Sequence, residues 1–405
     1  MREKSEIVYV IQPIENDNYK VLYDEIVALI ESADAEYAGT IYQNIREINP
    51  ATYIGEGKLQ ELRERLDGLD VTVLFNGELS PSQTLNISAA LDGKKVIDRT
   101  TLILDIFALR AESSEGKIQV ELAQLKYMYP RLKGKGEALS RLGGGIGTRG
   151  PGETKLETER RHIRARIHSL EQKLAETEKR RAQLTERRKK ERVKTVALVG
   201  YTNTGKSTLL NALTGANVFV KNALFATLDP TSRAFEIEGV PFLLVDTVGF
   251  LQSLPHHLIE AFKSTLESAI NCDLALIVCD AAGEYEMQLQ TTLETLRDMH
   301  FSSPYLTVMN KCDLVQDTSA HPKDSIFVSA KDGRGFEQLK AKIMEALQDE
   351  FIRTTLFVPY EKSAQYGSLR ALLTETQVTY TDFGSEIAAI IPVIYADKFR
   401  DFMKR

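Results

Sequence analysis

One octapeptide constrains the fold of this chain more than any other feature. Residues 200–207 read GYTNTGKS and match the phosphate-binding pattern G-x-x-x-x-G-K-[ST]. An apolar run over 193–199 precedes the octapeptide, and a helical pattern over 207–213 follows it. This context predicts a strand, a loop whose backbone amides surround phosphate oxygens, and a helix. Lys206 would place its ammonium on the β- and γ-phosphates, and Ser207 would offer its hydroxyl to Mg²⁺.

Three further strings follow in order, each directly after a predicted strand. They are Asp246-Thr247-Val248-Gly249 after 242–245, Asn310-Lys311-Cys312-Asp313 after 305–309, and Ser329-Ala330-Lys331 after 326–328, with another strand at 274–279. Apolar strands separated by helices favour a mainly parallel sheet, and ligands bind at the carboxyl edge of such sheets. The four strings therefore predict one nucleotide site, in which Asp246 holds the metal through water and the Gly249 amide meets the γ-phosphate.

The third and fourth strings identify the base. A carboxylate at Asp313 can accept both N–H donors on the Watson–Crick edge of guanine, an arrangement that adenine does not offer. A backbone amide of 329–331 can meet guanine O6, so GTP is the expected nucleotide. The residues expected to contact it in the four strings are Gly200, Asn203, Thr204, Gly205, Lys206, Ser207, Thr208, Asp246, Thr247, Val248, Gly249, Asn310, Lys311, Asp313, Ser329, Ala330 and Lys331.

A threonine between the first and second strings is expected to complete the metal shell when the γ-phosphate is present and to withdraw after hydrolysis. The window 225–231 reads FATLDPT and offers Thr227, with Thr231 as the competitor. Its first five residues, Phe225, Ala226, Thr227, Leu228 and Asp229, join the expected nucleotide contacts. Lys206, Thr227 and Gly249 are the expected catalytic residues, and Ser207 and Thr227 are the expected metal ligands.

The length of 405 residues predicts several domains. Residues 1–115 alternate strands (7–11, 35–42, 71–75, 95–97) with helices (19–32, 57–67 and one that begins at Ser80-Pro81), which predicts an N-terminal α/β domain. The GTPase domain is expected over 193–350. Residues 351–405, with strands at 356–359 and 387–394 and a helix at 363–374, are expected to form a small α+β domain. The fold class is α/β.

Residues 116–192 are expected to form an antiparallel helical hairpin, with helices over 118–132 and 153–192. Eight of the nineteen residues 134–152 are glycine, which predicts a mobile tip. Ile163, Ile167, Leu170, Leu174 and Leu184 form an apolar seam on the second helix. Residues 126–192 carry 20 Lys and Arg against nine Glu, a net charge of +11, while the whole chain carries −6. The hairpin is therefore a basic appendage on an acidic body.

Localisation follows from what the sequence lacks. No stretch approaches the roughly 20 apolar residues of a bilayer span, and the N-terminus shows no signal core. The three cysteines have no metal-binding spacing and suit a reducing compartment. These features predict a cytoplasmic protein without a transmembrane segment, and peripheral membrane association stays open.

The strings at 143–157 (GGGIGTRGPGETKLE), 225–231 and 53–58 (YIGEGK) resemble those of the HflX family of translational GTPases, in the Obg–HflX branch. The resemblance covers about residues 7–350. It implies that the N-terminal domain and the hairpin engage the large ribosomal subunit and its RNA, and that the protein splits stalled or stressed ribosomes. It also implies the Mg²⁺ roles of Ser207 and Thr227. ATP-dependent RNA remodelling is a further claim for some members.

Two alternatives accompany this reading. The first is a non-ribosomal GTP-dependent switch, membrane-associated in one version, that binds a protein partner through the hairpin seam. The second is an ATP-driven RNA helicase, which Asp313 and the lack of a second phosphate loop disfavour. Small GTPases place a water-orienting glutamine directly after D-x-x-G. Phe250 occupies that position, so slow hydrolysis alone and stimulation by ribosomes are expected. Asn203 resembles the K⁺ ligand of potassium-activated GTPases, although it would equally stabilise the loop turn.

Overall fold

The computed structural model describes residues 5–14, 19–140, 151–191, 193–215, 224–225, 231–252, 255, 258, 270–317 and 321–403. The chain divides into two compact units. The first comprises Met1–Glu186 together with Lys221–Asp229 and Leu251–Thr265. The second comprises Arg187–Val220, Pro230–Phe250 and Leu266–Arg405.

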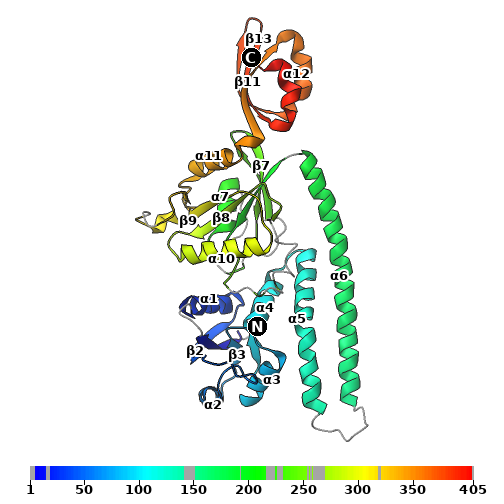
Figure 1. Ribbon diagram of the computed structural model, residues 1–405, viewed down its shortest axis with the longest axis vertical. Helices are drawn as coiled ribbons and strands as arrows, with labels where there is room; N and C mark the ends of the chain where they lie inside the picture. The colour runs from blue at the N-terminus through cyan, green and yellow to red at the C-terminus, as the bar shows by residue number, and fades with distance from the viewer. Residues whose placement is uncertain are drawn as a thin grey trace. The chain divides into compact units, whose positions relative to one another are not determined.

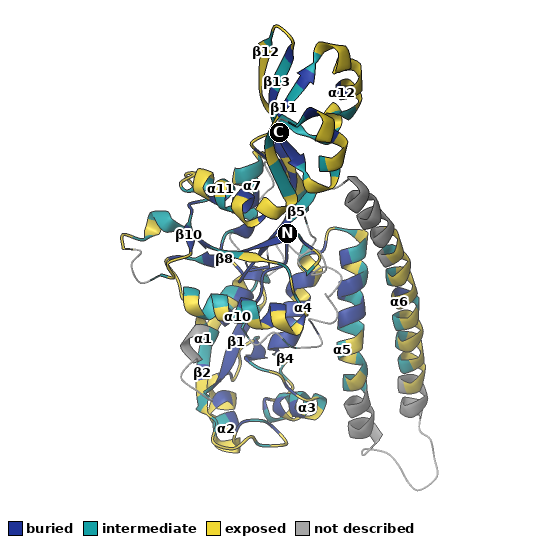
Figure 2. Cartoon of the chain, turned by 45° about the horizontal axis from the view of Figure 1, so that its top comes forward, coloured by how far each residue is buried: buried dark blue, intermediate teal, exposed yellow. Residues whose placement is uncertain are grey.

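The first unit contains a parallel four-stranded sheet in the order β2-β1-β3-β4 (Figure 1). Its strands are β1 (Ile7–Ile14), β2 (Glu36–Asn44), β3 (Thr72–Phe75) and β4 (Val96–Asp98). The two central strands, β1 and β3, are almost entirely buried, as Figure 2 shows for β1. Helices on both faces of a parallel sheet require such continuous apolar strands, which is why these strands stood out in the sequence.

Helices α1 (Tyr19–Ser32), α2 (Glu56–Arg65), α3 (Pro81–Ala90) and α4 (Arg99–Arg110) complete the α/β part of the first unit. The start of α3 confirms the predicted cap, since Ser80 Oγ accepts from the Gln83 amide and Gln83 Oε1 accepts from the Ser80 amide. The sequence analysis missed α4. Seven of its twelve residues are buried, so no polar stripe marks it as amphipathic.

The helical hairpin consists of α5 (Ser114–Ser140) and α6 (Pro151–Glu191). Ion pairs tie the two helices together, Glu121 to Arg166 and Lys126 to Glu171. On α6, Leu170 is buried and the neighbouring seam positions 163, 167 and 174 are partly buried. The expected loop over 134–152 was too long, because α5 stays helical to Ser140 and α6 begins at Pro151. Glycine costs only about 1 kcal/mol relative to alanine inside a helix, so Gly134 and Gly136 do not end α5.

A six-stranded sheet in the order β10-β9-β8-β5-β7-β6 forms the centre of the second unit. Its strands are β5 (Lys194–Val199), β6 (Thr231–Ile237), β7 (Val240–Asp246), β8 (Leu274–Asp280), β9 (Tyr305–Asn310) and β10 (Ile326–Phe327). All neighbours are parallel except β6 and β7, which form an antiparallel pair. The expected mainly parallel sheet is thus confirmed, and β6 is an additional edge strand.

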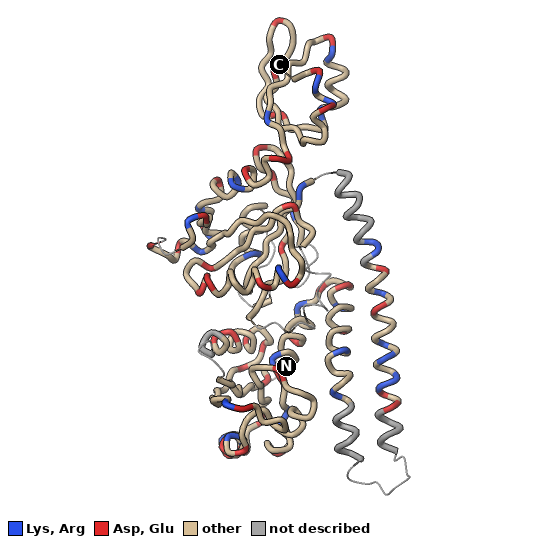
Figure 3. Tube along the Cα trace, viewed as in Figure 1, with Lys and Arg blue, Asp and Glu red and all other residues tan. Residues whose placement is uncertain are grey.

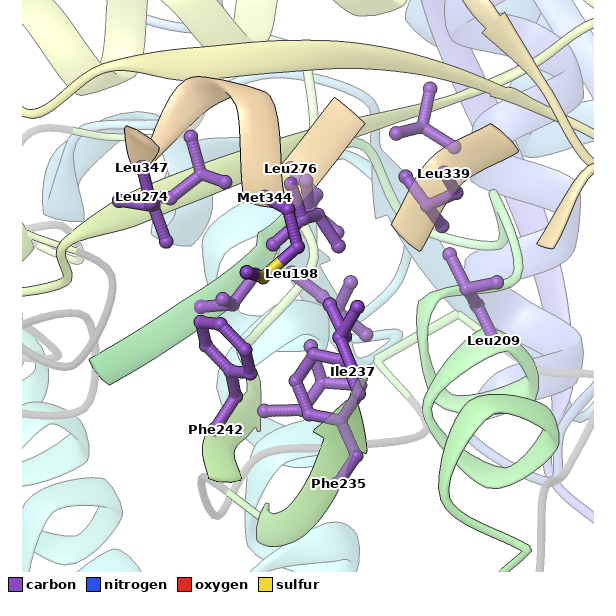
Figure 4. Close-up of a cluster of buried hydrophobic side chains, with 14 of the residues drawn as sticks. Leu198, Leu209, Phe235, Ile237, Phe242, Leu274, Leu276, Leu339, Met344 and Leu347 are labelled. Atoms are coloured by element: carbon purple, nitrogen blue, oxygen red, sulfur yellow. The ribbon is translucent and has the colours of Figure 1, made fainter. Parts of the chain in front are cut away.

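Helices α7 (Lys206–Thr214), α10 (Tyr285–Asp298) and α11 (Phe336–Ala346) cover this sheet. Figure 4 shows part of the core, where Leu198, Phe242 and Leu276 of the strands meet Leu339 and Met344 of α11. Burying a side chain of this size contributes about 1.5–3 kcal/mol. The core holds the strand ends, and therefore the loops after them, in place.

The C-terminal part of the second unit is an antiparallel sheet in the order β11-β13-β12. Its elements are β11 (Phe351–Pro359), α12 (Ser363–Leu369), β12 (Thr374–Thr381), β13 (Gly384–Pro392) and a 3₁₀ segment, η5 (Val393–Phe402). The expected helix over 363–374 is observed as α12 followed by a 3₁₀ turn, Arg370–Leu372, whereas β12 was missed. Residues 376–380 of β12 are all exposed, so the strand lacks the apolar alternation that reveals a strand in a sequence.

Candidate nucleotide site

The octapeptide forms the turn between β5 and α7. Gly200 has φ 150°, and a Cβ there would lie 2.3 Å from the carbonyl oxygen of Val278. Gly205 has φ 88°, and its Cβ would lie 2.3 Å from Asn310 Nδ2. Only glycine fits either position, because both combine a positive φ with close approach of another chain segment.

Lys206 begins α7 and is buried. Its Nζ donates to the carbonyl oxygens of Tyr201, at 2.7 Å, and Gly200, at 3.1 Å. Burial lowers the pKa of Lys206 to about 8, although the nearby Asp246 carboxylate opposes the shift. The side chain is a buried cation at the start of a helix, where an anion would also meet backbone N–H groups.

Ser207 and Asp246 meet at the same end of the sheet. Ser207 Oγ donates to Asp246 Oδ2 at 2.5 Å, and both side chains are largely withdrawn from solvent. A hydroxyl and a carboxylate are hard oxygen ligands of the kind that Mg²⁺ accepts, and Mg²⁺ usually takes its other ligands from phosphates and water. These residues therefore fit the metal that the sequence implies. Thr247, beside them, donates its hydroxyl to the Leu198 carbonyl at 2.7 Å.

The string after β7 is tied to the octapeptide through the backbone. The Thr202 amide donates to the Phe250 carbonyl at 2.8 Å, and the Phe250 amide donates to the Gly200 carbonyl at 3.0 Å. A Cβ on Gly249 would lie 2.8 Å from Thr202 Cα and 3.0 Å from Lys206 Nζ. Gly249 thus lies directly beside the buried ammonium. Val248 and Phe250 are buried.

The strings after β9 and β10 join the octapeptide through Asn310. Asn310 Nδ2 donates to the Thr204 carbonyl at 2.8 Å, and Asn310 Oδ1 accepts from the Ala330 amide at 3.0 Å. One buried side chain therefore links three of the four strings. Ser329 is also buried, whereas Lys331 is exposed.

Lys311 connects the octapeptide to the end of β8. Its Nζ donates to the Asn203 carbonyl at 2.9 Å and pairs with Asp280 Oδ2 at 2.6 Å. Asp280 ends β8 and was not among the sequence candidates, although its place at the carboxyl end of a strand was a usable signal. Asn203 is exposed, with φ 59°, which accounts for an asparagine there by turn geometry alone. Asp313 lies partly exposed in a 3₁₀ turn, Cys312–Leu314.

Two remaining groups of candidates have different outcomes. Thr208 lies partly buried on α7, beside Ser207. Of the five candidates from Phe225 to Asp229, the structure describes only Phe225, and Ala226, Thr227, Leu228 and Asp229 lie outside the described residues. Thr231 begins β6.

Phe225 belongs to the first unit rather than the second. Its ring packs against Phe107 of α4, edge to face, with the centroids 4.5 Å apart. The neighbouring Leu224 amide donates to Ser32 Oγ at 2.9 Å. The first unit therefore holds residues that flank the expected metal-binding threonine, a packing that the sequence did not predict.

The segment after Phe250 also packs in the first unit, through Arg99. Arg99 Nη2 donates to the Gln252 carbonyl at 3.0 Å and also forms an ion pair with Glu25. Arg99 and Glu25 are buried, and Asn76 Oδ1 accepts from Arg99 Nη1 at 3.1 Å. Burial raises the pKa of Glu25, while the Arg99 guanidinium opposes the shift. Sequence reasoning missed this group because its members lie far apart in the chain.

The parallel sheet, the phosphate-binding turn and the strings at three further strand ends define a P-loop GTPase. Family models described as GTP-binding GTPase N-terminal, GTP-binding GTPase middle region and 50S ribosome-binding GTPase match residues 21–108, 110–188 and 195–311. The GTPase HflX of Caldanaerobacter subterraneus is 44% identical over 410 residues, which span 99% of this chain and 94% of that protein. The chain belongs to the HflX family of GTPases.

Further relatives are consistent with this assignment. The GTPase HflX of Escherichia coli K12 is 41% identical over 379 residues, which span 90% of this chain and 87% of that protein. The crystal structure of SsGBP in complex with GDP has a TM-score of 0.50 at 27% identity, and the match covers 85% of this chain and 99% of that one. Among the helices that the structure describes, none is long and apolar enough to cross a membrane.

Proposed function

We propose that this GTPase acts on the large ribosomal subunit, binds ribosomal RNA through its basic hairpin, and splits or rescues stalled ribosomes. The family model for residues 195–311 is described as a 50S ribosome-binding GTPase. The observation that carries the proposal is the hairpin itself. Arginines and lysines recur along the described part of α6, as Figure 3 shows, and several of them are exposed, including Arg161, Lys179 and Arg180.

The alternative, a protein-binding switch that uses the α6 seam, is less well supported. The seam already faces α5, since Leu170 is buried and the ion pairs to Glu121 and Lys126 connect the two helices. A coiled-coil partner would have to displace α5. Exposed cations, in contrast, remain available to phosphates. An ATP-driven helicase is a weaker alternative still, because Asp313 suits guanine.

Salt dependence tests the proposal. Replacing Arg141 and Arg149 at the hairpin tip with Ala is expected to weaken binding to large subunits and to flatten its salt dependence, because each lost phosphate contact lowers the slope of log K against log salt by about 0.9. GTP affinity of the isolated protein should not change. Both residues lie outside the described part of the chain. Cosedimentation over a salt series, with and without a non-hydrolysable GTP analogue, measures the effect.

Removal of two arginines elsewhere provides the control. Arg353 and Arg400 are exposed and paired with Glu238 and Asp397, so a double Ala variant there removes the same charge outside both the hairpin and the N-terminal domain. Equal losses in both double variants would show that binding follows net charge alone. Unaltered binding of the Arg141 and Arg149 variant at every salt concentration would contradict the proposed RNA contact.

We further propose the nucleotide roles of the site residues. Ser207 and Thr227 would hold Mg²⁺, with Asp246 linked through water, and the ion would offset negative charge on the phosphates. Lys206 would replace its contacts with the Gly200 and Tyr201 carbonyls by contacts with phosphate oxygens. Asp313 would accept the two guanine N–H donors. Asn310 and Lys311 would hold the loops that carry these groups.

A proton should accompany nucleotide binding. In the free protein the pKa of Lys206 is about 8, and adjacent phosphates should raise it. Above about pH 8, the free protein has neutral Lys206 and must take up a proton to bind GDP, so affinity should fall by up to tenfold per pH unit. Calorimetry at about pH 8.5, in two buffers that differ in ionisation enthalpy, would measure the number of protons taken up when GDP binds. GMP, which lacks the β-phosphate, should show none, and equal uptake for both nucleotides would refute the assignment.

Hydrolysis by the isolated protein should be slow and should depend on the ribosome. The phenyl ring of Phe250 is buried and can neither donate nor accept a hydrogen bond to water. The first unit, which includes the hairpin, also holds Leu224, Phe225 and the carbonyl of Gln252. A large ribosomal subunit that binds the hairpin would therefore bind the same unit that holds the residues close to Thr227 and Gly249 in the sequence. It could change the positions of those residues.

We expect ribosomes to raise GTP turnover at least about tenfold, equivalent to about 1.4 kcal/mol of barrier. Turnover should be measured in K⁺ and Na⁺ buffers, with and without ribosomes, for wild type and Asn203→Ala. Fast turnover without ribosomes that is indifferent to K⁺ would refute the inference from Phe250. A K⁺-specific rate that Asn203→Ala removes would instead identify K⁺ as the missing group.

A further inference from the structure

The two edges of the C-terminal sheet differ. At the β11 edge, Leu356 forms a bridge with Met403 near the chain end. At the other edge, β12 pairs only with β13, and no backbone hydrogen bond joins its outer side to another described segment. In an antiparallel pair, alternate residues turn their N–H and C=O groups away from the partner. Strand β12 therefore presents unpaired backbone groups to solvent.

Only the start of β12 carries features that protect such an edge. Proteins usually block edge strands with lysine or another charged side chain, with proline or with a bulge. Residues 374–381 read TETQVTYT and contain neither lysine nor proline. A bulge lies between Glu375 and Gln377, and the residues from Gln377 to Thr381 then pair in regular register with β13. The regular part is rich in residues that favour extended structure.

Exposed aromatic side chains gather where β12 turns into β13. Phe383 and Tyr380 are 81% and 76% exposed, more than any other large apolar side chain in the described part of the chain. Tyr360 is also exposed, and its hydroxyl donates to the Thr381 carbonyl at 2.7 Å, which holds it at the same end of the sheet. Aromatic side chains exposed together in this way are typical of binding surfaces.

The charge around these aromatic residues is negative. Residues 374–397 contain four acidic residues, of which Glu375 and Asp397 pair with Arg370 and Arg400 and the other two, Asp382 and Glu386, are close in sequence to Phe383. Asp382 lies in the turn and Glu386 faces Phe357 across the sheet, whereas Glu361 after Tyr360 is followed by Lys362. Such a surface repels the phosphates of nucleic acid and attracts cations. Arginine and lysine also bind favourably to aromatic rings.

We propose that β12 binds an extended, basic segment of another protein by strand addition. The outward backbone groups of β12 would supply main-chain hydrogen bonds, and alternate side chains of the bound segment would meet Tyr380, Phe383 and Asp382. This surface shares no residue with the nucleotide site or with the hairpin, and the proposal does not depend on the ribosomal function.

Full-length protein and a fluorescent nine-residue peptide of alternating Lys and Val provide the test, by fluorescence anisotropy. We expect the peptide of alternating Lys and Val to bind the protein at least about tenfold more tightly than a peptide of alternating Glu and Val. It should exceed a basic peptide of Lys, Gly and Ser by the same factor. Thr379→Lys, which adds a repelling charge to the open edge, should weaken binding at least about tenfold. Thr355→Lys adds the same charge to an exposed position of β11 and should change the affinity for the peptide less than about twofold. Bound peptide should slow hydrogen exchange in residues 376–381.

Other results would overturn the proposal. Equal effects of the two Lys variants, or equal binding of the Lys, Gly and Ser peptide, would show charge attraction without strand addition. No binding of the alternating peptide would exclude this surface as a site for basic segments. Tighter binding of a single-stranded RNA at the same edge would assign it to nucleic acid. Self-association of wild type that Thr379→Lys abolishes, measured by sedimentation, would assign the edge to a second copy of the chain.

Discussion

Replacing Asp313 with Asn is expected to reverse the base preference of the nucleotide site from guanine to xanthine. The wild-type carboxylate would accept two guanine N–H donors, and hydrogen bonds to a charged group contribute about 1.5–3 kcal/mol each. After the substitution the amide oxygen can still accept one N–H, but the new NH₂ group faces the other guanine donor, so the loss of one bond should lower GTP affinity by about 10- to 10²-fold. Xanthine carries a carbonyl at its 2-position, which the new amide N–H can meet. Competition of GTP and XTP against a fluorescent guanine nucleotide measures the change.

Asp332→Asn is a matched control for this substitution. Asp332 is exposed in the loop after β10, where its carboxylate pairs with Arg334 at 2.7 Å. The same chemical change there should leave the preference for GTP intact. If Asp313→Asn still prefers GTP over XTP, another residue reads the base.

Gly249→Ala is expected to impair GTP hydrolysis strongly. The new Cβ would lie 2.8 Å from Thr202 Cα and 3.0 Å from Lys206 Nζ, so the octapeptide and the residues after β7 would have to separate. That movement would break the backbone hydrogen bonds that join Phe250 to Gly200 and Thr202. It would also displace the amide that is proposed to meet the γ-phosphate. We expect GTP turnover to fall at least about 100-fold, equivalent to about 2.7 kcal/mol.

The effect should fall on GTP more than on GDP, because GDP lacks the γ-phosphate. Binding of GDP and of a non-hydrolysable GTP analogue to Gly249→Ala distinguishes the two. Gly57→Ala is the control, since Gly57 lies in α2 and a Cβ there has no atom within 4 Å. Equal losses for both nucleotides would mean that the substitution disturbs the whole octapeptide and not the γ-phosphate contact alone.

Strong local patterns predicted most of the architecture correctly. The central strands of both sheets, such as β3 and β8, were recognised because they are buried on both faces and therefore consist of continuous apolar runs. The edge strand β6 was missed, and two further elements were missed for opposite reasons. Helix α4 is buried over most of its length, polar residues included, and β12 is exposed over most of its length, so neither shows the amphipathic period that identifies an element.

The candidate site was predictable to the extent that it consists of loops at the ends of parallel strands. Such loops must meet at one edge of the sheet, so the order of the four strings implied their proximity. What joins them was not predictable. Asp280 pairs with Lys311, and Asn310 connects Thr204 to Ala330, through contacts between residues about 20 to 106 positions apart.

By itself, the sequence determined the nucleotide class, the family and the basic hairpin, because each depends on residue types within one short segment. Only the tertiary structure decided where the segments flanking Thr227 and Gly249 pack. Phe225 lies against Phe107 and the Gln252 carbonyl accepts from Arg99, so these two residues, which are close to Thr227 and Gly249 in the sequence, pack within the first unit. The open edge of β12 was likewise decided by folding. A strand becomes an edge only through the absence of a neighbour, and no local pattern of residues encodes that absence.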